Sequence, residues 1–491
     1  MMRLKSTASG IHDAGSDKSF IVVGAGLSGL VCARELLRHG VSNIVVLEAS
    51  DRVGGRNLSV MVHGTRVDLG GQWLAPERQQ PNIHRLVREL GLTVHPQHYS
   101  GTRILDLKSR SEPMQYKTDI PTGLGVGGLI VAQWAMTWSL LRALLFVGRG
   151  VNRGSKLMGM DAKSAQQALE GLVGNAGQGG TRALVQAMVR GIFGCEPSQM
   201  SWLHYLHYVA CAGGVECLVK IRGGFQESTI SGGAQQVSEM LFDQVREMGG
   251  HVTFGCRVTE VRTLEDEVVV TCADGRSCSA SRIIFAAPPA RLAGISFYPE
   301  LPEEREELQK ACFIGCIIKS VVLYEQAFWR DKGFSGEVVA EADEDAAPCF
   351  NVYDHCVDGK AMLVCFINGA PAKAWSARPA EERQAAVLAQ LAKWFGEEAQ
   401  HPVHYIEKDW VVDEFTGGCP VGVYPPGKLA PYMEAIRAPC ERIHWAGTEA
   451  ADHCQGFMDG AVQSGERAAR EALEAEGIRR QAASSGPCGR R

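Results

Sequence analysis

Two residues far along the chain have surroundings that favour chemistry. Lys319 is the only cation in the apolar, β-rich run IGCIIKSVVLYE. A buried ammonium is costly without a partner, so an interior lysine usually has a function, although the same periodicity also fits an outward-facing strand residue. Cys419 follows two glycines in GGCPVGVYPPG, where a turn would expose its thiol as a nucleophile. A free structural cysteine is the alternative, because the chain has 16 cysteines.

A glycine-rich turn near the N-terminus has the spacing of a nucleotide site. The sequence GAGLSG at 24–29 follows the apolar run SFIVV and opens a helical pattern. In such a turn the pyrophosphate of a dinucleotide lies against amide N–H groups at the helix N-terminus. Glu48 ends the next apolar run, where its carboxylate can accept hydrogen bonds from the adenosine ribose. The sequence therefore predicts dinucleotide binding, and Glu48 argues against the 2′-phosphate of NADP.

The segment DRVGGR at 51–56 narrows the choice of cofactor. Its two glycines would let the backbone approach the cofactor, and Arg56 can face a phosphate, a solvated arginine turn being the alternative. Together with GAGLSGL and LEA, this segment resembles the flavin-containing amine oxidase superfamily nearly letter for letter. Phytoene desaturases and other flavoproteins share this early motif. The resemblance at this point implies FAD, not amine chemistry.

Three later segments resemble the monoamine oxidases within that superfamily. The sequence WAGTE at 445–449, with a helical run from Met458, is similar to the family's last FAD motif, GTE followed by a GYMEGA-like helix. The N-terminus of such a helix would favour negative charge on the reduced flavin. The runs around Lys319 and Cys419 resemble two further monoamine oxidase segments. The resemblance covers about residues 19–475, with the motifs in the family's order.

The resemblance also implies roles for single residues. Cys419 would bond through its sulfur to the 8α position of FAD, and Lys319 would hold a water near flavin N5 and assist the reaction of reduced flavin with oxygen. Trp410 would line the flavin, and Phe457 would present a ring to the substrate amine. Gln226 matches a polar pocket residue, with a surface glutamine as the alternative.

From the motifs and the resemblance together we predict Lys319, Phe457 and Gln226 as catalytic residues and no metal site. The predicted cofactor-binding residues are Gly24, Gly26, Leu27, Ser28, Gly29, Glu48, Ala49, Arg56, Gly71, Gln72, Trp73, Val258, Trp410, Cys419, Gly447, Thr448, Glu449, Gly456, Phe457 and Met458.

The chain departs from the monoamine oxidase pattern beside the proposed flavin link. That family flanks the substrate amine with two aromatic rings, one just after the flavin-bonded cysteine and one in the GYMEGA-like helix. Here Pro420 stands at the first position, and Phe457 supplies the second ring. Val219 and Ile192 fall where the family has its apolar gate. Half of the aromatic pair is missing, so the resemblance leaves the substrate open.

Two other substrate classes, L-amino acids and polyamines, would require particular residues in the pocket. An L-amino acid oxidase should carry an arginine that pairs with the substrate carboxylate, often in a GGPMR-like segment. This chain has GGQWL at 70–74 instead. A polyamine oxidase would want acidic pocket residues, for which Glu216 and Glu227 are the nearby candidates. A flavin-binding scaffold without turnover is an alternative from another class, against which Lys319 and Cys419 both argue.

The elements that must position these residues alternate between strands and helices. A strand, glycine turn, helix and second strand from Ser19 form a βαβ unit. Further strands are predicted at 251–275, 282–289 and 442–449. We therefore expect a mixed α/β fold, a Rossmann-like FAD-binding domain of the p-hydroxybenzoate hydroxylase or glutathione reductase type, interleaved with a substrate domain of mixed sheet and helices. The predicted FAD-binding domain comprises 19–99, 231–305 and 413–475, and the predicted substrate domain comprises 100–230 and 306–412.

Length and composition agree with an enzyme that buries a cofactor. A chain of 491 residues exceeds a single core, and its net charge of -5, without a basic run, argues against nucleic-acid binding. Scattered cysteines without CxxC pairs indicate reduced thiols and a cytoplasmic protein. We predict a disordered leader at 1–18 and a disordered tail at 476–491. The apolar run at 128–148 contains Gln133 and Arg142, which favours a helix packed on its own protein over a transmembrane anchor and leaves membrane-surface association open.

The sequence thus predicts an FAD-dependent amine oxidase. The reaction would convert a primary or secondary amine and O2, through an imine, into an aldehyde, ammonia or a smaller amine, and hydrogen peroxide. A polyamine oxidase or an L-amino acid oxidase of the same superfamily remains the alternative, and the sequence leaves a homodimer open.

Overall fold

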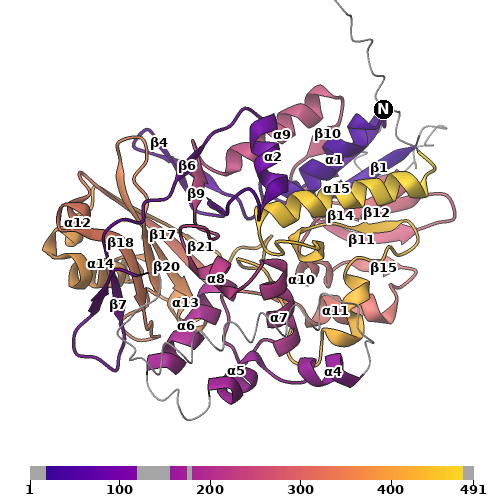
Figure 1. Ribbon diagram of the computed structural model, residues 1–491. Helices are drawn as coiled ribbons and strands as arrows, with labels where there is room; N and C mark the ends of the chain where they lie inside the picture. Colours follow the sequence, from indigo (N-terminus) through magenta and orange to yellow (C-terminus); the bar gives the residue numbers. More distant parts are fainter. Residues whose placement is uncertain (1–17, 119–154, 174–179, 479–491) are drawn as a thin grey trace, which may run out of the picture.

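The computed structural model describes residues 18–118, 155–173 and 180–478, which form a mixed α/β fold. A parallel sheet with its helices and a larger mixed sheet lie on opposite sides of the molecule (Figure 1). The helices α4 (Ser155–Asp161), α5 (Ala165–Val173), α6 (Gly180–Phe193), α7 (Trp202–Cys211) and α8 (Val215–Val219) lie along one edge between them. Within the described ranges no helix is long and apolar enough to cross a bilayer, and the run at 128–148 falls outside those ranges.

The parallel sheet carries the predicted nucleotide site. Its five strands, in the order β10-β2-β1-β14-β23, are His251–Thr253, Asn43–Leu47, Ser19–Val23, Arg282–Phe285 and Ile443–Trp445, and all neighbours run parallel. Strand β1 is buried along its whole length because both faces are covered. Phe20 and Val22 pack against helices, whereas Ile21 and Val23 pack against a second, mixed sheet. In the order β13-β12-β11-β15 its strands are Ser277–Ala280, Val268–Cys272, Val258–Thr263 and Ser296–Tyr298.

The helices on that sheet bring both ends of the chain together. Helix α1 (Leu27–Arg38) packs along α15 (Met458–Ala475), and α9 (Gln235–Glu247) and α2 (Pro81–Glu89) complete the layer. The small residues Gly465, Ala468 and Ala469 on α15 permit this close approach, since a Cβ at Gly465 would lie 2.4 Å from the Ser28 carbonyl oxygen. The predicted strand-turn-helix at the end of the chain is therefore observed, with its helix beginning at Met458.

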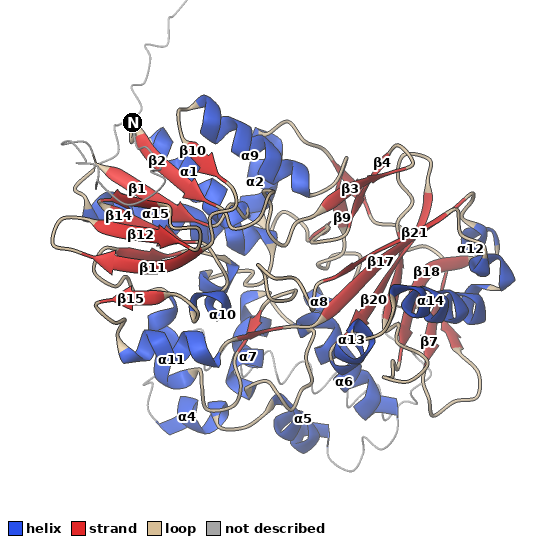
Figure 2. Cartoon of the chain, turned by 180° about the vertical axis from the view of Figure 1, so that it is seen from behind, coloured by secondary structure: helices blue, strands red, loops and turns tan. Residues whose placement is uncertain are grey.

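The mixed sheet has seven strands, and the strand that carries Lys319 is second from its edge. Figure 2 shows this sheet from behind. In the order β21-β17-β20-β19-β18-β7-β8 they are His404–Asp409, Ile317–Tyr324, Ala361–Asn368, Asn351–Asp354, Phe334–Ala340, Thr102–Asp106 and Met114–Tyr116. Helices α14 (Ala380–Phe395), α13 (Ala370–Ser376) and α12 (Phe328–Asp331) cover one face of this sheet. There they pack against strand residues such as Ile318 and Val322. Lys319 alternates with these residues and therefore points to the opposite face.

Three small sheets accompany the larger ones in the described residues, one of them the pair β3 (Ser59–Val62) and β4 (Thr65–Asp68). The antiparallel sheet β5-β9-β6 consists of Trp73–Leu74, Ser228–Ile230 and Val94–Pro96, and β16 (Phe313–Ile314) pairs with β22 (Gly422–Val423). The strands of the parallel sheet fall within the ranges predicted for FAD binding, and those of the seven-stranded sheet within the substrate ranges. Because β9 pairs with strands from the other predicted domain, the exact domain limits stay a prediction.

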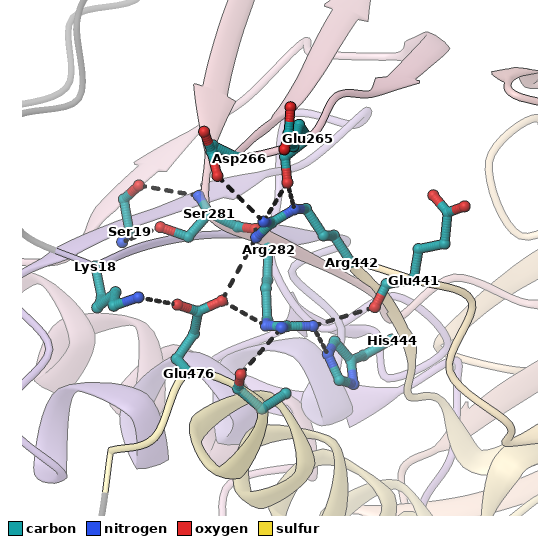
Figure 3. A network of polar contacts seen from close by, with 11 residues as sticks. Lys18, Ser19, Glu265, Asp266, Ser281, Arg282, Glu441, Arg442, His444 and Glu476 are labelled. Atoms are coloured by element: carbon teal, nitrogen blue, oxygen red, sulfur yellow. Dashed lines mark hydrogen bonds and ion pairs between the residues drawn. The ribbon is translucent and has the colours of Figure 1, made fainter.

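Residues at both predicted disordered ends belong to an ordered polar network (Figure 3). Lys18 and Arg282 both donate to the Glu476 carboxylate, and Arg442 lies 3.7 Å from it. Ile478 packs against the core under α1 and α9. Lys18 and residues 476–478 thus make specific contacts with the folded chain, and the limits of the leader and the tail stay predictions. Residues 1–17 and 479–491 lie outside the described ranges.

Candidate active site

A cavity of about 900 Å³ is lined by residues of both large sheets. Every predicted catalytic and cofactor-binding residue lines it, except Gly29 and Glu449. At one end lie the glycine turn and Glu48, and at the other lie side chains of the seven-stranded sheet and of helices α5 to α8. The fold thus brings together segments that are up to about 430 residues apart in the sequence.

The glycine turn at 24–29 forms a cradle, an open backbone surface on the cavity, and its glycines serve two different purposes. Gly24 has φ +105° and donates its amide to the Leu47 carbonyl, which closes the turn against β2. A Cβ at Gly26 would meet no atom within 4 Å, so its open side faces the cavity and leaves room for a phosphate. A Cβ at Gly29 would lie 1.9 Å from the Gly24 carbonyl oxygen. Gly29 therefore permits the packing of α1 and does not itself line the cofactor space, contrary to its predicted contact.

Glu48 is held at the edge of this cradle. One carboxylate oxygen accepts the Ala25 amide at 2.6 Å, and the other accepts the Ser50 amide at 2.9 Å and the Ser50 hydroxyl at 2.7 Å. Since a carboxylate has about four acceptor sites, one remains for a ribose hydroxyl. The open cradle at Gly26 and this fixed carboxylate fit the adenosine diphosphate half of FAD.

Arg56 has a different partner from the predicted phosphate. Its guanidinium donates to both carboxylate oxygens of Glu449, at 2.6 and 3.0 Å, and to the Pro420 carbonyl at 2.8 Å. Burial alone would lower the pKa of Arg56, but attraction by Glu449 outweighs it and raises that pKa. Burial would raise the pKa of Glu449, and Arg56 instead holds it below its usual range. Glu449 is therefore a buried partner of Arg56 behind the cavity wall, and the phosphate contact of Arg56 stays a prediction.

Lys319 lies inside the protein, so the outward-facing alternative is wrong. Its ammonium donates to the Gly70 carbonyl at 2.9 Å and to Gln72 Oε1 at 2.7 Å. The rings of Trp73 and Phe366 flank it at 5.2 and 5.6 Å. Burial lowers the pKa of Lys319 to about 8, with partial compensation by the nearby Asp68 carboxylate. A lysine whose charge changes near pH 8 is suited to chemistry at this point.

Cys419 lies on a turn that glycine conformations allow. Gly417 and Gly418 have φ +71° and +136°, and the Cys419 amide donates to the Gly315 carbonyl at 2.9 Å. The half-buried thiol lines the cavity. Burial raises the pKa of Cys419 to about 11, and the positive charges of Arg56 and Lys319 oppose that rise. Burial thus favours the neutral thiol of Cys419, whereas the charges of Arg56 and Lys319 favour its thiolate.

Aromatic rings line the cavity in two groups, most of which the sequence did not reveal. The ring of Phe457, the residue before α15, lies 4.1 Å from Phe225 and 5.9 Å from Tyr208 between centroids. Trp73 contacts Tyr353 at 5.2 Å and Phe366 at 5.8 Å. Phe225, beside Gln226, was within reach of sequence reasoning, but the others carry no local signal because ordinary core strands and helices have the same pattern. Trp410 is buried and donates to the Leu69 carbonyl at 2.9 Å.

The substrate end of the cavity lacks the predicted acidic residues. Glu216 pairs with Lys220 at 2.9 Å, and Glu227 accepts the Gly223 amide at 3.0 Å; neither is among the described residues that line the cavity. Gln226 lines it, as do Val219 and Ile192.

The chain matches known proteins over nearly its whole length. The family of flavin containing amine oxidoreductases matches residues 27–473. A protein of Mycobacterium tuberculosis named flavin-containing monoamine oxidase AofH is 34% identical over 458 residues, which cover 92% of this chain and 95% of that protein. Horse (Equus caballus) flavin-containing amine oxidase A is 33% identical over 474 residues, covering 94% of this chain and 86% of that protein.

Solved structures agree with this match. Putrescine oxidase bound to putrescine has a TM-score of 0.84 at 28% identity, covering 93% of this chain and 99% of that chain. Cyclohexylamine oxidase from Brevibacterium oxydans IH-35A has a TM-score of 0.85 at 28% identity, covering 94% and 100%. With its dinucleotide cradle and its interior lysine on one cavity, the chain belongs to the flavin-containing amine oxidoreductase family and is an oxidoreductase that acts on amines.

Proposed function

We propose that this chain deaminates a primary or secondary amine with O2, giving an aldehyde through the imine, ammonia or a smaller amine, and hydrogen peroxide. The proposal is carried by one observation: the cofactor cradle, the Lys319 ammonium and the Cys419 thiol all face a single cavity. When bound, FAD supplies the hydride acceptor and the route of electrons to O2. The chain's own residues bind, orient and desolvate the reactants.

We assign the two ends of the cavity to the two halves of this chemistry. The Gly24–Gly26 turn and Glu48 would hold the adenosine diphosphate part of FAD. The N-terminus of α15, which begins at Met458 on the cavity wall, would favour negative charge at the flavin ring. Cys419 would attach the cofactor through its sulfur at the 8α position.

Lys319 is proposed to act on oxygen. Two of its three N–H groups are occupied by Gly70 and Gln72, which fixes the ammonium and leaves one donor for a water or for reduced oxygen. A positive charge in a dry cavity stabilises the negative charge that develops as O2 accepts an electron. Below a pH of about 8 the side chain carries this charge.

The cavity favours an amine with an apolar body. Its substrate end is lined by Leu169, Met188, Ile192, Val219 and Val339. These side chains would exclude water and leave the amine neutral for reaction.

A diamine would bring a second ammonium to the substrate end of the cavity. The described residues there offer it no carboxylate that lacks a partner. Glu337, which lines this end of the cavity, already pairs with Arg103 at 2.6 Å. We therefore place aryl and alkyl monoamines before diamines, although putrescine oxidase has a similar fold.

A panel of aryl amines, alkyl amines, polyamines and L-amino acids, with hydrogen peroxide as the readout, tests this proposal. We expect peroxide from aryl or alkyl monoamines at the highest kcat/KM. Peroxide from diamines or amino acids alone would overturn the substrate assignment. No peroxide from any compound, with FAD bound, would favour a flavin-binding scaffold.

We infer a cytoplasmic location from the cysteines. All fifteen cysteines in the described ranges are free thiols, which is typical of a reducing compartment. A homodimer and contact of 128–148 with a membrane surface are kept as predictions from the sequence. Size-exclusion chromatography tests the first, and co-sedimentation with lipid vesicles tests the second.

A further inference from the structure

The turn that carries Cys419 is hydrogen-bonded to a buried ion pair, Arg56 and Glu449, whose members are far apart in the sequence. Arg56 donates to the Pro420 carbonyl at 2.8 Å, and Glu449 Oε1 accepts the Gly422 amide at 3.1 Å. Arg56 and Glu449 join each other through two hydrogen bonds, at 2.6 and 3.0 Å. The pair therefore clamps both ends of the segment that follows the cysteine.

This clamp lies directly behind the reactive end of the cavity. The Glu449 side chain is 1% exposed, whereas Arg56 lines the cavity beside Cys419. A Cβ added at Gly422 would lie 2.8 Å from the Cys312 sulfur and 3.1 Å from the Glu449 side chain, so only glycine fits at this end of the segment. Since the fork of an arginine and a carboxylate has a narrow range of orientations, it fixes the backbone that it holds.

We propose that the Arg56–Glu449 pair is a positioning device for covalent attachment of the cofactor, which holds the Cys419 sulfur at the place where the 8α carbon of FAD arrives. The inference rests on the proposed attachment of FAD to Cys419. Arg56 and Glu449 are positioning residues, because they act on the cysteine through the backbone of 420–422.

The attachment itself balances with reactants that the proposed function already supplies. A carbon–sulfur bond forms between Cys419 and the 8α carbon, while the thiol and the 8α methyl group each lose one proton. The remaining electron pair passes into the flavin ring, which becomes reduced by two electrons. O2 then takes these two electrons and two protons and leaves as hydrogen peroxide. Because the reaction needs sulfur in contact with one carbon, displacement of the turn by about 1 Å should slow it strongly.

A role of the ion pair through its charge and a role through position predict opposite effects of Glu449→Gln on the rate of FAD attachment. Arg56 and Lys319 lower the pKa of the Cys419 thiol, whereas Glu449 raises it. If the pair acted only through charge, Glu449→Gln would favour the thiolate and speed attachment. If it acts by position, the same variant loosens the fork and slows attachment. The direction of the change therefore separates the two accounts.

The experiment adds FAD to apoprotein and follows the fraction of flavin that stays with acid-precipitated protein, beside the total FAD bound before precipitation. Glu407→Gln is the matched control, since one carboxylate oxygen of Glu407 accepts two hydrogen bonds from Arg383, at 2.5 and 2.8 Å, on the edge strand β21, and Glu407 does not line the cavity. We expect wild type and Glu407→Gln to attach FAD at equal rates. Glu449→Gln and Arg56→Lys should bind FAD but attach it at least about tenfold more slowly.

Each other outcome has a defined meaning. Equal or faster attachment in Glu449→Gln would overturn the positioning role. Loss of bound FAD from both variants would overturn it as well, because the pair would then belong to the cofactor site itself. A colourless pellet from wild type would remove covalent attachment, and this inference with it, while peroxide production from amines would leave the proposed oxidase intact.

Discussion

The two ends of the cavity are built in different ways. The best-defined part of the cofactor end is the stretch 24–56, which supplies glycine backbone and the Glu48 carboxylate. The reaction end consists of side chains from several separate segments, among them Lys319 on β17, Cys419 on its turn and Phe457 before α15. A backbone cradle depends on local geometry, whereas the reaction end depends on packing of the whole molecule. The comparison teaches that cofactor binding and catalysis should respond to different kinds of substitution.

The largest effect is expected at Gly29, where the cradle meets the core. In Gly29→Ala the new Cβ would lie 1.9 Å from the Gly24 carbonyl oxygen, against backbone that cannot move aside freely. We expect a loss of about 3 kcal/mol or more in the free energy of unfolding, and protein without FAD. Urea unfolding and flavin content measure the two effects.

Gly26→Ala is the control for that prediction. Gly26 has φ -68°, and its Cβ would meet no protein atom within 4 Å, so this variant should fold normally. The methyl group would instead occupy the space for the phosphates and weaken FAD binding. If both variants had the same stability, the division between a packing glycine and a cradle glycine would be wrong.

The next effect concerns the reaction end alone. Lys319→Met should bind FAD and be reduced by amines at nearly the rate of wild type, but react with O2 roughly 100-fold more slowly. Burial lowers the pKa of Lys319 to about 8, so reoxidation of wild type should slow as pH rises through 8 and the ammonium is lost. Stopped-flow measurement of both half-reactions checks this. A variant that slowed reduction as much as reoxidation, or kept the pH dependence, would contradict the assignment.

A smaller effect is expected at the aromatic wall. Phe457→Ala removes a ring that packs on Phe225 at 4.1 Å and borders the cavity. We expect a decrease of about tenfold in kcat/KM for amines with little change in bound FAD, because the ring orients the substrate and not the cofactor. Phe457→Tyr, which keeps the ring, should retain most of the activity. An equal loss in both variants would argue against an orienting ring.

The sequence predicted the cofactor end well because its signals are local. The strand before the glycine turn, the helix after it and Glu48 at the end of the next strand all follow from spacing within about 30 residues. The interior position of Lys319 was also predictable from the cost of a lone cation in a sheet. The partner of Arg56 was not, since Glu449 is 393 positions away and the fold alone brings the two together. The rings of Tyr353 and Phe366 were missed for the same reason, because their positions look like ordinary strand residues.

The smallest effect on amine oxidation is expected at His444, which is not among the described residues that line the cavity. His444 on β23 is 2% exposed, and burial with the charges of Arg282 and Arg467 lowers its pKa to about 4 (Figure 3). The unfolded chain takes up the proton near pH 6.5 and the folded protein near 4, so His444 reduces stability as pH falls between these values. The loss should approach about 3 kcal/mol at pH 4 and be smaller in His444→Gln, as measured by urea unfolding against pH. Equal pH dependence in the two proteins would exclude this role.

The most direct test of the account is anaerobic mixing of the purified flavoprotein with an aryl or alkyl monoamine, followed by admission of O2. The account predicts that the amine bleaches the visible flavin absorption, and that O2 restores it with one hydrogen peroxide per flavin. In Lys319→Met the amine should still bleach the flavin, but O2 should restore the absorption much more slowly. A flavin that stays oxidised with every monoamine, while the protein is folded and loaded with FAD, would contradict the claim that this cavity oxidises amines.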